Sequence, residues 1–105
     1  MRESSIEDYL VRRVRELGGE VRKVQWIGRK GAPDRLVMLP PGIVVYPGPE
    51  FGYTIWVELK AEGLAALFPH TPHERQQHRE HERMRAMGQL VVVIDSYAGV
   101  EELLS

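Results

Sequence analysis

Two charged residues near the middle of the chain combine types and spacing that suit phosphodiester hydrolysis. Glu58 and Lys60 end a stretch, residues 53–60, whose aromatic and β-branched residues predict a β-strand. Side chains alternate between the two faces of a strand, so Glu58 and Lys60 share one face. Ionised groups among apolar neighbours are costly unless they are paired or bind a metal ion. A simple Glu–Lys ion pair at a strand end is therefore one interpretation, and a hydrolytic site is the other.

Asp34 favours the hydrolytic interpretation. It follows Pro33 and begins a mostly apolar segment, residues 34–39, that also predicts a strand. If 34–39 and 53–60 pair antiparallel with Asp34 opposite Glu58, residues 40–52 form the connection, and they hold four of the seven prolines. The two carboxylates would then lie about 5 Å apart, Cβ to Cβ, and repel unless a cation lies between them. Oxygen ligands of this kind suit Mg²⁺ or Mn²⁺, which activates water, while a lysine beside it stabilises charge on a phosphate.

The elements that position these residues follow from apolar spacing and from turn residues. Ser4 or Ser5 is expected to cap a first helix that ends at Gly18, and Thr71 is expected to cap a later one. The continuous apolar run 90–94 is typical of a strand buried on both faces. In chain order we expect the first helix, strands over 21–26, 34–39 and 53–60, a helix from 72 or 73 to about 87, a strand over 90–94 and a helix over 97–104, with a further small strand conceivable at 43–46. This order predicts one α/β domain over residues 1–105, with a mixed four-stranded sheet flanked by helices.

Composition excludes several classes of site. The chain of 105 residues has no cysteine, which excludes disulfides, thiolate zinc sites and a cysteine nucleophile. No apolar run approaches the roughly 20 residues of a membrane span. The four histidines have irregular spacing and no thiol partners, so zinc is a weak alternative. Trp26, Trp56 and Tyr53 are interpreted first as core or interface residues, with base stacking open to them if they are exposed.

The net charge of −1 conceals a basic segment. Residues 12–35 hold eight Lys and Arg against three Asp and Glu. A segment of this charge can bind a phosphate backbone, although a solvated helix edge followed by a loop is the simpler alternative. The candidate DNA-binding residues are Arg12, Arg13, Arg22, Lys23, Arg29, Lys30 and Arg35.

The motifs together resemble a known nuclease family. Gly31-Ala32-Pro33-Asp34-Arg35-Leu36 followed by Val57-Glu58-Leu59-Lys60 resembles the PD-(D/E)xK nuclease superfamily. The whole chain resembles its virus-type replication-repair nuclease family, VRR-NUC, through Ile6-Glu7-x-Tyr9-Leu10, Gln77 and Val93-Ile94-Asp95-Ser96. The resemblance implies a restriction-endonuclease-like αβββαβ core and an Mg²⁺- or Mn²⁺-dependent endonuclease. It further implies a homodimer that acts on branched DNA such as four-way junctions. The chain departs from the family at residues 40–52, where a much tighter hairpin is usual.

The resemblance also implies roles for single residues. Asp34 and Glu58 correspond to metal ligands, with the backbone carbonyl of Leu59 as a further one, and Lys60 corresponds to the catalytic lysine. Glu7 corresponds to an acid on the first helix, although a carboxylate in a first turn can also be satisfied by backbone N–H groups. Gln77 corresponds to a supporting amide, and its neighbour Gln76 takes that place if the register slips by one.

Partners and location complete the expectations. We expect DNA as the partner, no membrane association, no small-molecule cofactor, and a location in the cytoplasm of a bacterial or phage-infected host cell. A non-catalytic DNA-binding module, or a subunit of a DNA repair complex with the same fold, is the alternative function.

Overall fold

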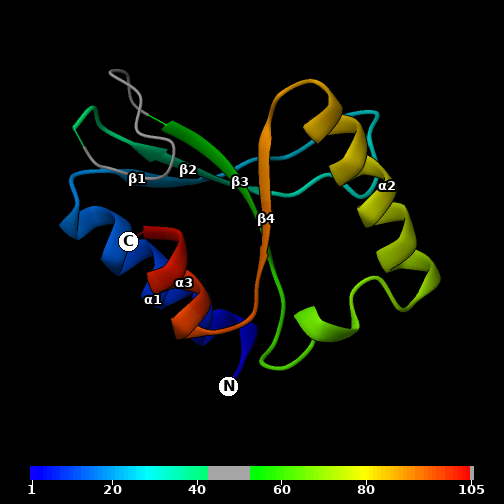
Figure 1. Ribbon diagram of the computed structural model, residues 1–105, viewed down its shortest axis with the longest axis horizontal. Helices are drawn as coiled ribbons and strands as arrows, with labels where there is room; N and C mark the ends of the chain where they lie inside the picture. Colours follow the sequence, from blue (N-terminus) through cyan, green and yellow to red (C-terminus); the bar gives the residue numbers. More distant parts are fainter. Residues whose placement is uncertain (43–52, 105) are drawn as a thin grey trace.

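The computed structural model describes residues 1–42 and 53–104, so the small strand considered at 43–46 lies outside the described residues. The expected element order is confirmed, with a short 3₁₀ helix, η1, added before the second α-helix (Figure 1). The elements are α1 (Glu3–Glu16), β1 (Glu20–Lys23), β2 (Arg35–Leu39), β3 (Tyr53–Leu59), η1 (Ala65–Leu67), α2 (Pro72–Ala86), β4 (Leu90–Ile94) and α3 (Tyr97–Leu104).

The sheet has the strand order β1-β2-β3-β4, with β4 parallel to β3 and the other neighbouring pairs antiparallel. Strands β2 and β3 pair Arg35 with Val57 and Leu39 with Tyr53, which is the register predicted from Asp34 and Glu58. Helix α2 forms the crossover between the parallel strands β3 and β4, since two parallel strands cannot be joined by a tight turn. The expected mixed α/β sheet is therefore confirmed.

The hydrophobic core lies between the sheet and α1 with α3. Ile6, Leu10 and Val14 recur at helical spacing on α1 and are fully buried. They pack in one cluster with alternate residues of β2 and β3, including Val37 and Val57. Glu58 and Trp56 therefore face the other side of the sheet, where α2 lies (Figure 1).

Several predicted boundaries differ from the structure, chiefly the start of the first helix and the end of the first strand. Neither Ser4 nor Ser5 caps α1, because the helix already begins at Glu3, and Arg2 precedes it without a side-chain cap. The first strand ends at Lys23 rather than at 26, and beyond it the Trp26 indole donates a hydrogen bond to the Pro33 carbonyl at 2.8 Å. The expected cap of α2 is confirmed, because the Thr71 hydroxyl accepts from the Glu74 amide in a reciprocal capping box.

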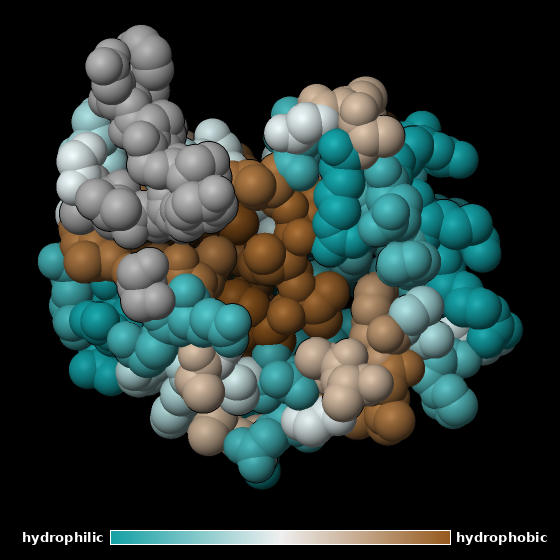
Figure 2. Space-filling view, in the orientation of Figure 1, coloured by the Kyte–Doolittle hydropathy of each residue, from teal (hydrophilic) through white to brown (hydrophobic). Residues whose placement is uncertain are grey.

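The expectation that residues 90–94 are buried on both faces is confirmed in part, since Val91 and Ile94 point to opposite faces and are both buried. Strand β4 is the edge strand of the described sheet, and its only strand neighbour is β3. Leu90 is 41% exposed, and Val92 and Val93 are half-buried. Hydrophobic surface accordingly gathers over β4 in the centre of Figure 2. No helix within the described ranges is both long and apolar enough to span a membrane.

Candidate active site

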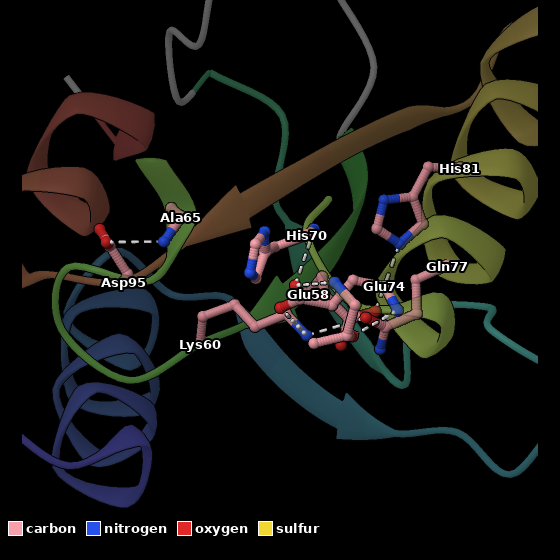
Figure 3. Close-up of polar contacts among 9 residues, drawn as sticks. Glu58, Lys60, Ala65, His70, Glu74, Gln77, His81 and Asp95 are labelled. Atoms are coloured by element: carbon pink, nitrogen blue, oxygen red, sulfur yellow. Dashed lines mark hydrogen bonds and ion pairs between the residues drawn. The ribbon is translucent and has the colours of Figure 1, made fainter. Parts of the chain in front are cut away.

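Glu58 lies near the end of β3, buried beneath α2. Its side chain is close to a fully buried histidine, with His81 Nε2 3.3 Å from Glu58 Oε1 (Figure 3). The imidazole also stacks on the ring of Phe68, with 5.6 Å between centroids. Among the described residues, His81 Nδ1 has no hydrogen-bond partner. The tautomer with the proton on Nε2 therefore donates to the carboxylate, and the packing of His81 fixes where that carboxylate lies.

Lys60 is held by two side chains of α2. Its Nζ lies 2.8 Å from Gln77 Oε1 and 3.5 Å from Glu74 Oε2 (Figure 3). The ammonium group also lies 5.3 Å from the centroid of the Phe68 ring, within cation–π range. These contacts place the lysine on the same side of the sheet as Glu58, as strand alternation predicted. Gln77, and not Gln76, is the amide that reaches it.

Glu74 both caps α2 and supplies the negative charge beside Lys60. Its Oε1 accepts hydrogen bonds from the backbone amides of His70 at 2.9 Å and Thr71 at 3.2 Å. These backbone donors, followed by the charge of Lys60, hold the pKa of the Glu74 carboxyl below its usual value. The carboxylate thus stays ionised at neutral pH and compensates the largely buried lysine.

The contacts of α2 were only partly predictable. Glu74, Gln77 and His81 follow one another at spacings of three and four, so they line one face of the helix and meet β3 together. Gln77 was identified through the family resemblance, whereas Glu74 and His81 were missed as site residues. The polar 74-77-81 stripe, opposite the charged outer face, was the signal that could have found them.

Asp34 lies one residue before β2. Continuing the β2–β3 register by that residue places its Cα opposite Glu58, as expected. Its side chain is 59% exposed, however, and Oδ1 lies 2.8 Å from the guanidinium of Arg35. Its position is thus the predicted one, while its carboxylate is paired with Arg35 rather than directed at Glu58.

Glu7 reaches this region from the other side of the sheet. Its carboxylate forms an ion pair with Arg35, whose side chain is only 11% exposed. Arg35 therefore forms ion pairs with both Glu7 of α1 and Asp34. The structure does not bring Glu7 into contact with Glu58 or Lys60.

The backbone beside Glu58 leaves one carbonyl oxygen without a donor from the sheet. Along a strand, neighbouring residues direct their N–H and C=O groups to opposite sides. The Lys60 amide donates to the Ile94 carbonyl on β4 at 2.9 Å, so the Leu59 carbonyl points toward β2. The register places Pro33 opposite Leu59, and proline has no N–H to donate.

The available donors fit a hard divalent cation. Carboxylates of Asp34 and Glu58 and the Leu59 carbonyl are oxygen ligands, which Mg²⁺ and Mn²⁺ prefer. Glu58 is only 8% exposed and has no Lys or Arg within ion-pair distance in the described part of the chain. A buried carboxylate without a cation is unfavourable, so a bound cation would satisfy it. Within the same residues, no group of three or more His, Asp or Glu side chains is placed to hold a metal.

The basic segment is largely neutralised by the fold. Three of its arginines pair with acids that are distant in sequence, namely Arg13 with Glu101, Arg29 with Glu80 and Arg35 with Glu7. Arg12 and Arg22 pair with nearby acids, Glu16 and Glu20. Hydrogen bonds from Arg13 and then Tyr9 lower the pKa of Glu101 to about 2, so that pair persists at neutral pH. Lys23 and Lys30 are exposed and have no acidic partner among the described residues.

Comparisons with known proteins bear on the family of the chain. No family model matches the sequence. The chain is 43% identical over 96 residues to a protein of Acyrthosiphon pisum secondary endosymbiont phage 1 described as "Putative nuclease p44", and the match covers 91% of this chain and 85% of that protein. It also matches a solved structure, "VRR_NUC domain", with a TM-score of 0.68 and 36% identity over 96% of this chain and 91% of the other. The chain therefore belongs to the VRR-NUC family.

Proposed function

We propose that this protein is a metal-dependent endonuclease that hydrolyses phosphodiester bonds in branched DNA, such as four-way junctions. The observation that carries the proposal is Lys60, fixed by Gln77 and Glu74 on the face where Glu58 is buried and Asp34 lies opposite. Two acidic residues at facing register positions and a fixed lysine contribute little to simple binding but suit hydrolysis. The nuclease description of the phage relative supports the reaction class, and its source supports a setting in a phage-infected bacterial cell.

Each residue of the site has a role in this proposal. Asp34, Glu58 and the Leu59 carbonyl would hold Mg²⁺ or Mn²⁺, which supplies an activated water and neutralises charge on a phosphoryl oxygen when bound. Lys60 donates hydrogen bonds to the scissile phosphate, where negative charge develops. Gln77 and Glu74 fix its Nζ, and His81 fixes the carboxylate of Glu58.

Arg35 and Glu7 act around the edge of the sheet. Arg35 holds the Asp34 carboxylate and is itself held by Glu7, so the two residues position that ligand from behind. The first-helix acid is thereby assigned a positioning role through Arg35.

Cleavage assays test the reaction and the substrate together. Labelled four-way junction, flap and linear duplex DNA are incubated with the protein in Mg²⁺ or Mn²⁺. We expect the junction to be cut fastest, and Asp34→Ala and Lys60→Ala to lower the rate at least 100-fold, as expected for the loss of a metal ligand or of charge stabilisation. Cleavage that persists in both variants would refute the proposed site. Salt-sensitive binding without any cleavage would instead favour a non-catalytic DNA-binding module.

We further propose that the protein acts as a homodimer. A four-way junction has two-fold symmetry, so two matching incisions suit two chains related by a two-fold axis. The apolar edge of β4 supports such an association, since exposed edge strands readily pair with another chain. Sedimentation equilibrium should give twice the chain mass of 12.0 kDa. Leu90→Lys should weaken the dimer at least tenfold, because a lysine opposes edge pairing, whereas a wild-type protein found only as monomer would contradict the dimer.

A further inference from the structure

A basic cleft lies on the outer side of α2. It has a volume of about 640 Å³ and lies between the loop that carries Arg29 and Lys30 and the helix residues Gln76, Arg79 and Arg83. The helix residues recur at spacings of three and four, so they form a stripe of their own. This stripe is distinct from the 74-77-81 stripe that holds Lys60 and Glu58. The surface of α2 in Figure 2 is hydrophilic, as this composition requires.

Among the described residues, the only acidic one that lines the cleft, Glu80, is paired with arginines of the cleft. Glu80 is 6% exposed and accepts hydrogen bonds from Arg29 Nε at 3.0 Å and Nη2 at 2.9 Å. It also accepts one from Arg83 at 3.3 Å. This bidentate pairing fastens the loop to the helix and uses both carboxylate oxygens. Four cations against one acid leave the cleft with a net charge of +3.

Lys30 and Arg79 supply the charge available to a ligand. Both side chains are exposed, and within residues 1–42 and 53–104 neither forms an ion pair or a hydrogen bond. A cleft with unpaired cations on both walls, closed by the Arg29–Glu80 pair, is complementary to a polyanion. Because the same loop leads directly to Asp34, a strand bound in this cleft would continue toward the proposed active site.

An aromatic hollow of about 400 Å³ adjoins the cleft and shares Arg29 and Glu80 with it. Trp26 and Trp56 line it, with ring centroids 5.1 Å apart and planes tilted by 45°. Their indole N–H groups donate to the Pro33 carbonyl and to Gln89 Oε1. The two rings therefore expose apolar ring surface to the hollow. Such a surface suits a flat aromatic ligand such as a nucleobase.

We propose that the cleft and the hollow together form a second DNA-contact site, which binds backbone phosphates in the cleft and an unpaired base against Trp26 and Trp56. This inference rests on the proposed function and extends it to a cause of structure selectivity. A base can enter the hollow only where it has left the duplex stack, as at a branch point. A fully paired duplex would therefore contact the site through its backbone phosphates alone.

Binding measured in the absence of a divalent metal tests this site separately from cleavage. Trp26 and Trp56 are the only two tryptophans of the chain, so intrinsic tryptophan fluorescence reports on the hollow alone. In EDTA, the probes are single-stranded oligothymidylate of about 12 nucleotides, a length within the usual range of single-strand sites, and a blunt duplex of equal length. We expect the single strand to quench the fluorescence and the duplex to bind with much less quenching. Trp56→Leu should weaken binding of oligothymidylate about tenfold or more while leaving the duplex affinity unchanged.

Charge variants test the cleft. Lys30→Gln and Arg79→Gln should each lower the slope of log K against log salt for oligothymidylate by about 0.7, the value of one released counterion. Arg15→Gln is the matched control, because Arg15 is equally charged, exposed and located on α1 across the sheet, and it should leave the slope unchanged.

Two results would overturn the inference. One is the absence of quenching by oligothymidylate, and the other is an equal slope in Lys30→Gln, Arg79→Gln and Arg15→Gln. Either would leave the proposed function intact if junction DNA is still cut in Mg²⁺ or Mn²⁺. Failure of the proposed function would appear separately, as normal binding with no cleavage in any metal.

Discussion

Replacing Glu58 with glutamine should abolish cleavage and at the same time make the metal-free protein more stable. The glutamine retains an oxygen that can accept the hydrogen bond from His81 Nε2, so the packing of α2 against β3 is preserved. It removes the negative charge needed to hold a divalent cation. We expect the cleavage rate to fall at least 1,000-fold, about 4 kcal/mol in activation free energy.

The gain in stability follows from the burial of Glu58. Its carboxylate is 8% exposed, and among the described residues no Lys or Arg lies within ion-pair distance of it. A buried charge without a full counter-charge lowers the free energy of unfolding, and a neutral isostere relieves part of that cost. We expect Glu58→Gln to raise the free energy of unfolding by about 1 kcal/mol, which in a domain of this size raises Tm by roughly 4–8 °C.

Two measurements and a control separate these effects. Thermal unfolding in EDTA measures the stability, and Mn²⁺ titration followed by electron paramagnetic resonance measures metal binding. Glu82→Gln makes the same chemical change at an exposed position of α2, where Glu82 pairs with Arg85, and should alter neither quantity appreciably. A Glu58→Gln protein that binds Mn²⁺ as tightly as the wild type would refute the ligand role of Glu58.

The sequence predicts correctly those features of the site that depend on regular geometry within a strand or between two paired strands. Strand alternation puts Glu58 and Lys60 on one face whatever surrounds them. The register followed from matching two apolar strands across a proline-rich connection, and Arg35 opposite Val57 confirms it. Both inferences use only properties of neighbouring residues.

Distant packing explains what the sequence could not predict. The partners of Arg13 and Arg29 lie 88 and 51 residues away, so no local pattern relates the basic segment to the acids that neutralise it. The rotation of α2 about its axis decides that Glu74 and His81 meet Lys60 and Glu58. The apolar run of β4 resembles a central strand, and only the topology places it at the edge.

The loop before Asp34 depends on one close contact with α2, and this gives the second large prediction. Gly31 has φ +83°, and a Cβ atom added there would lie 3.0 Å from the Gln76 carbonyl oxygen and from two backbone atoms of Gln77. Backbone atoms of a helix cannot move aside, so Gly31→Ala should push the loop away from α2. Asp34 would move with the loop, three residues further on. A displacement of about 1 Å in a catalytic group can lower a rate about 100-fold.

Gly63→Ala separates the contact from the backbone conformation. Gly63 has φ +85°, almost the same as Gly31, and a Cβ there meets nothing within 4 Å. Each alanine incurs the penalty of a positive φ, about 1–2 kcal/mol, whereas only Gly31→Ala adds overpacking of about 1–3 kcal/mol. Gly63→Ala should therefore be mildly destabilised and fully active, and Gly31→Ala should unfold at a lower denaturant concentration and cleave about 100-fold more slowly. If the two variants match in both unfolding midpoint and cleavage rate, the contact with α2 does not position Asp34. A Gly31→Ala protein that loses stability yet cleaves at the wild-type rate would show that the loop tolerates displacement without moving the metal ligand.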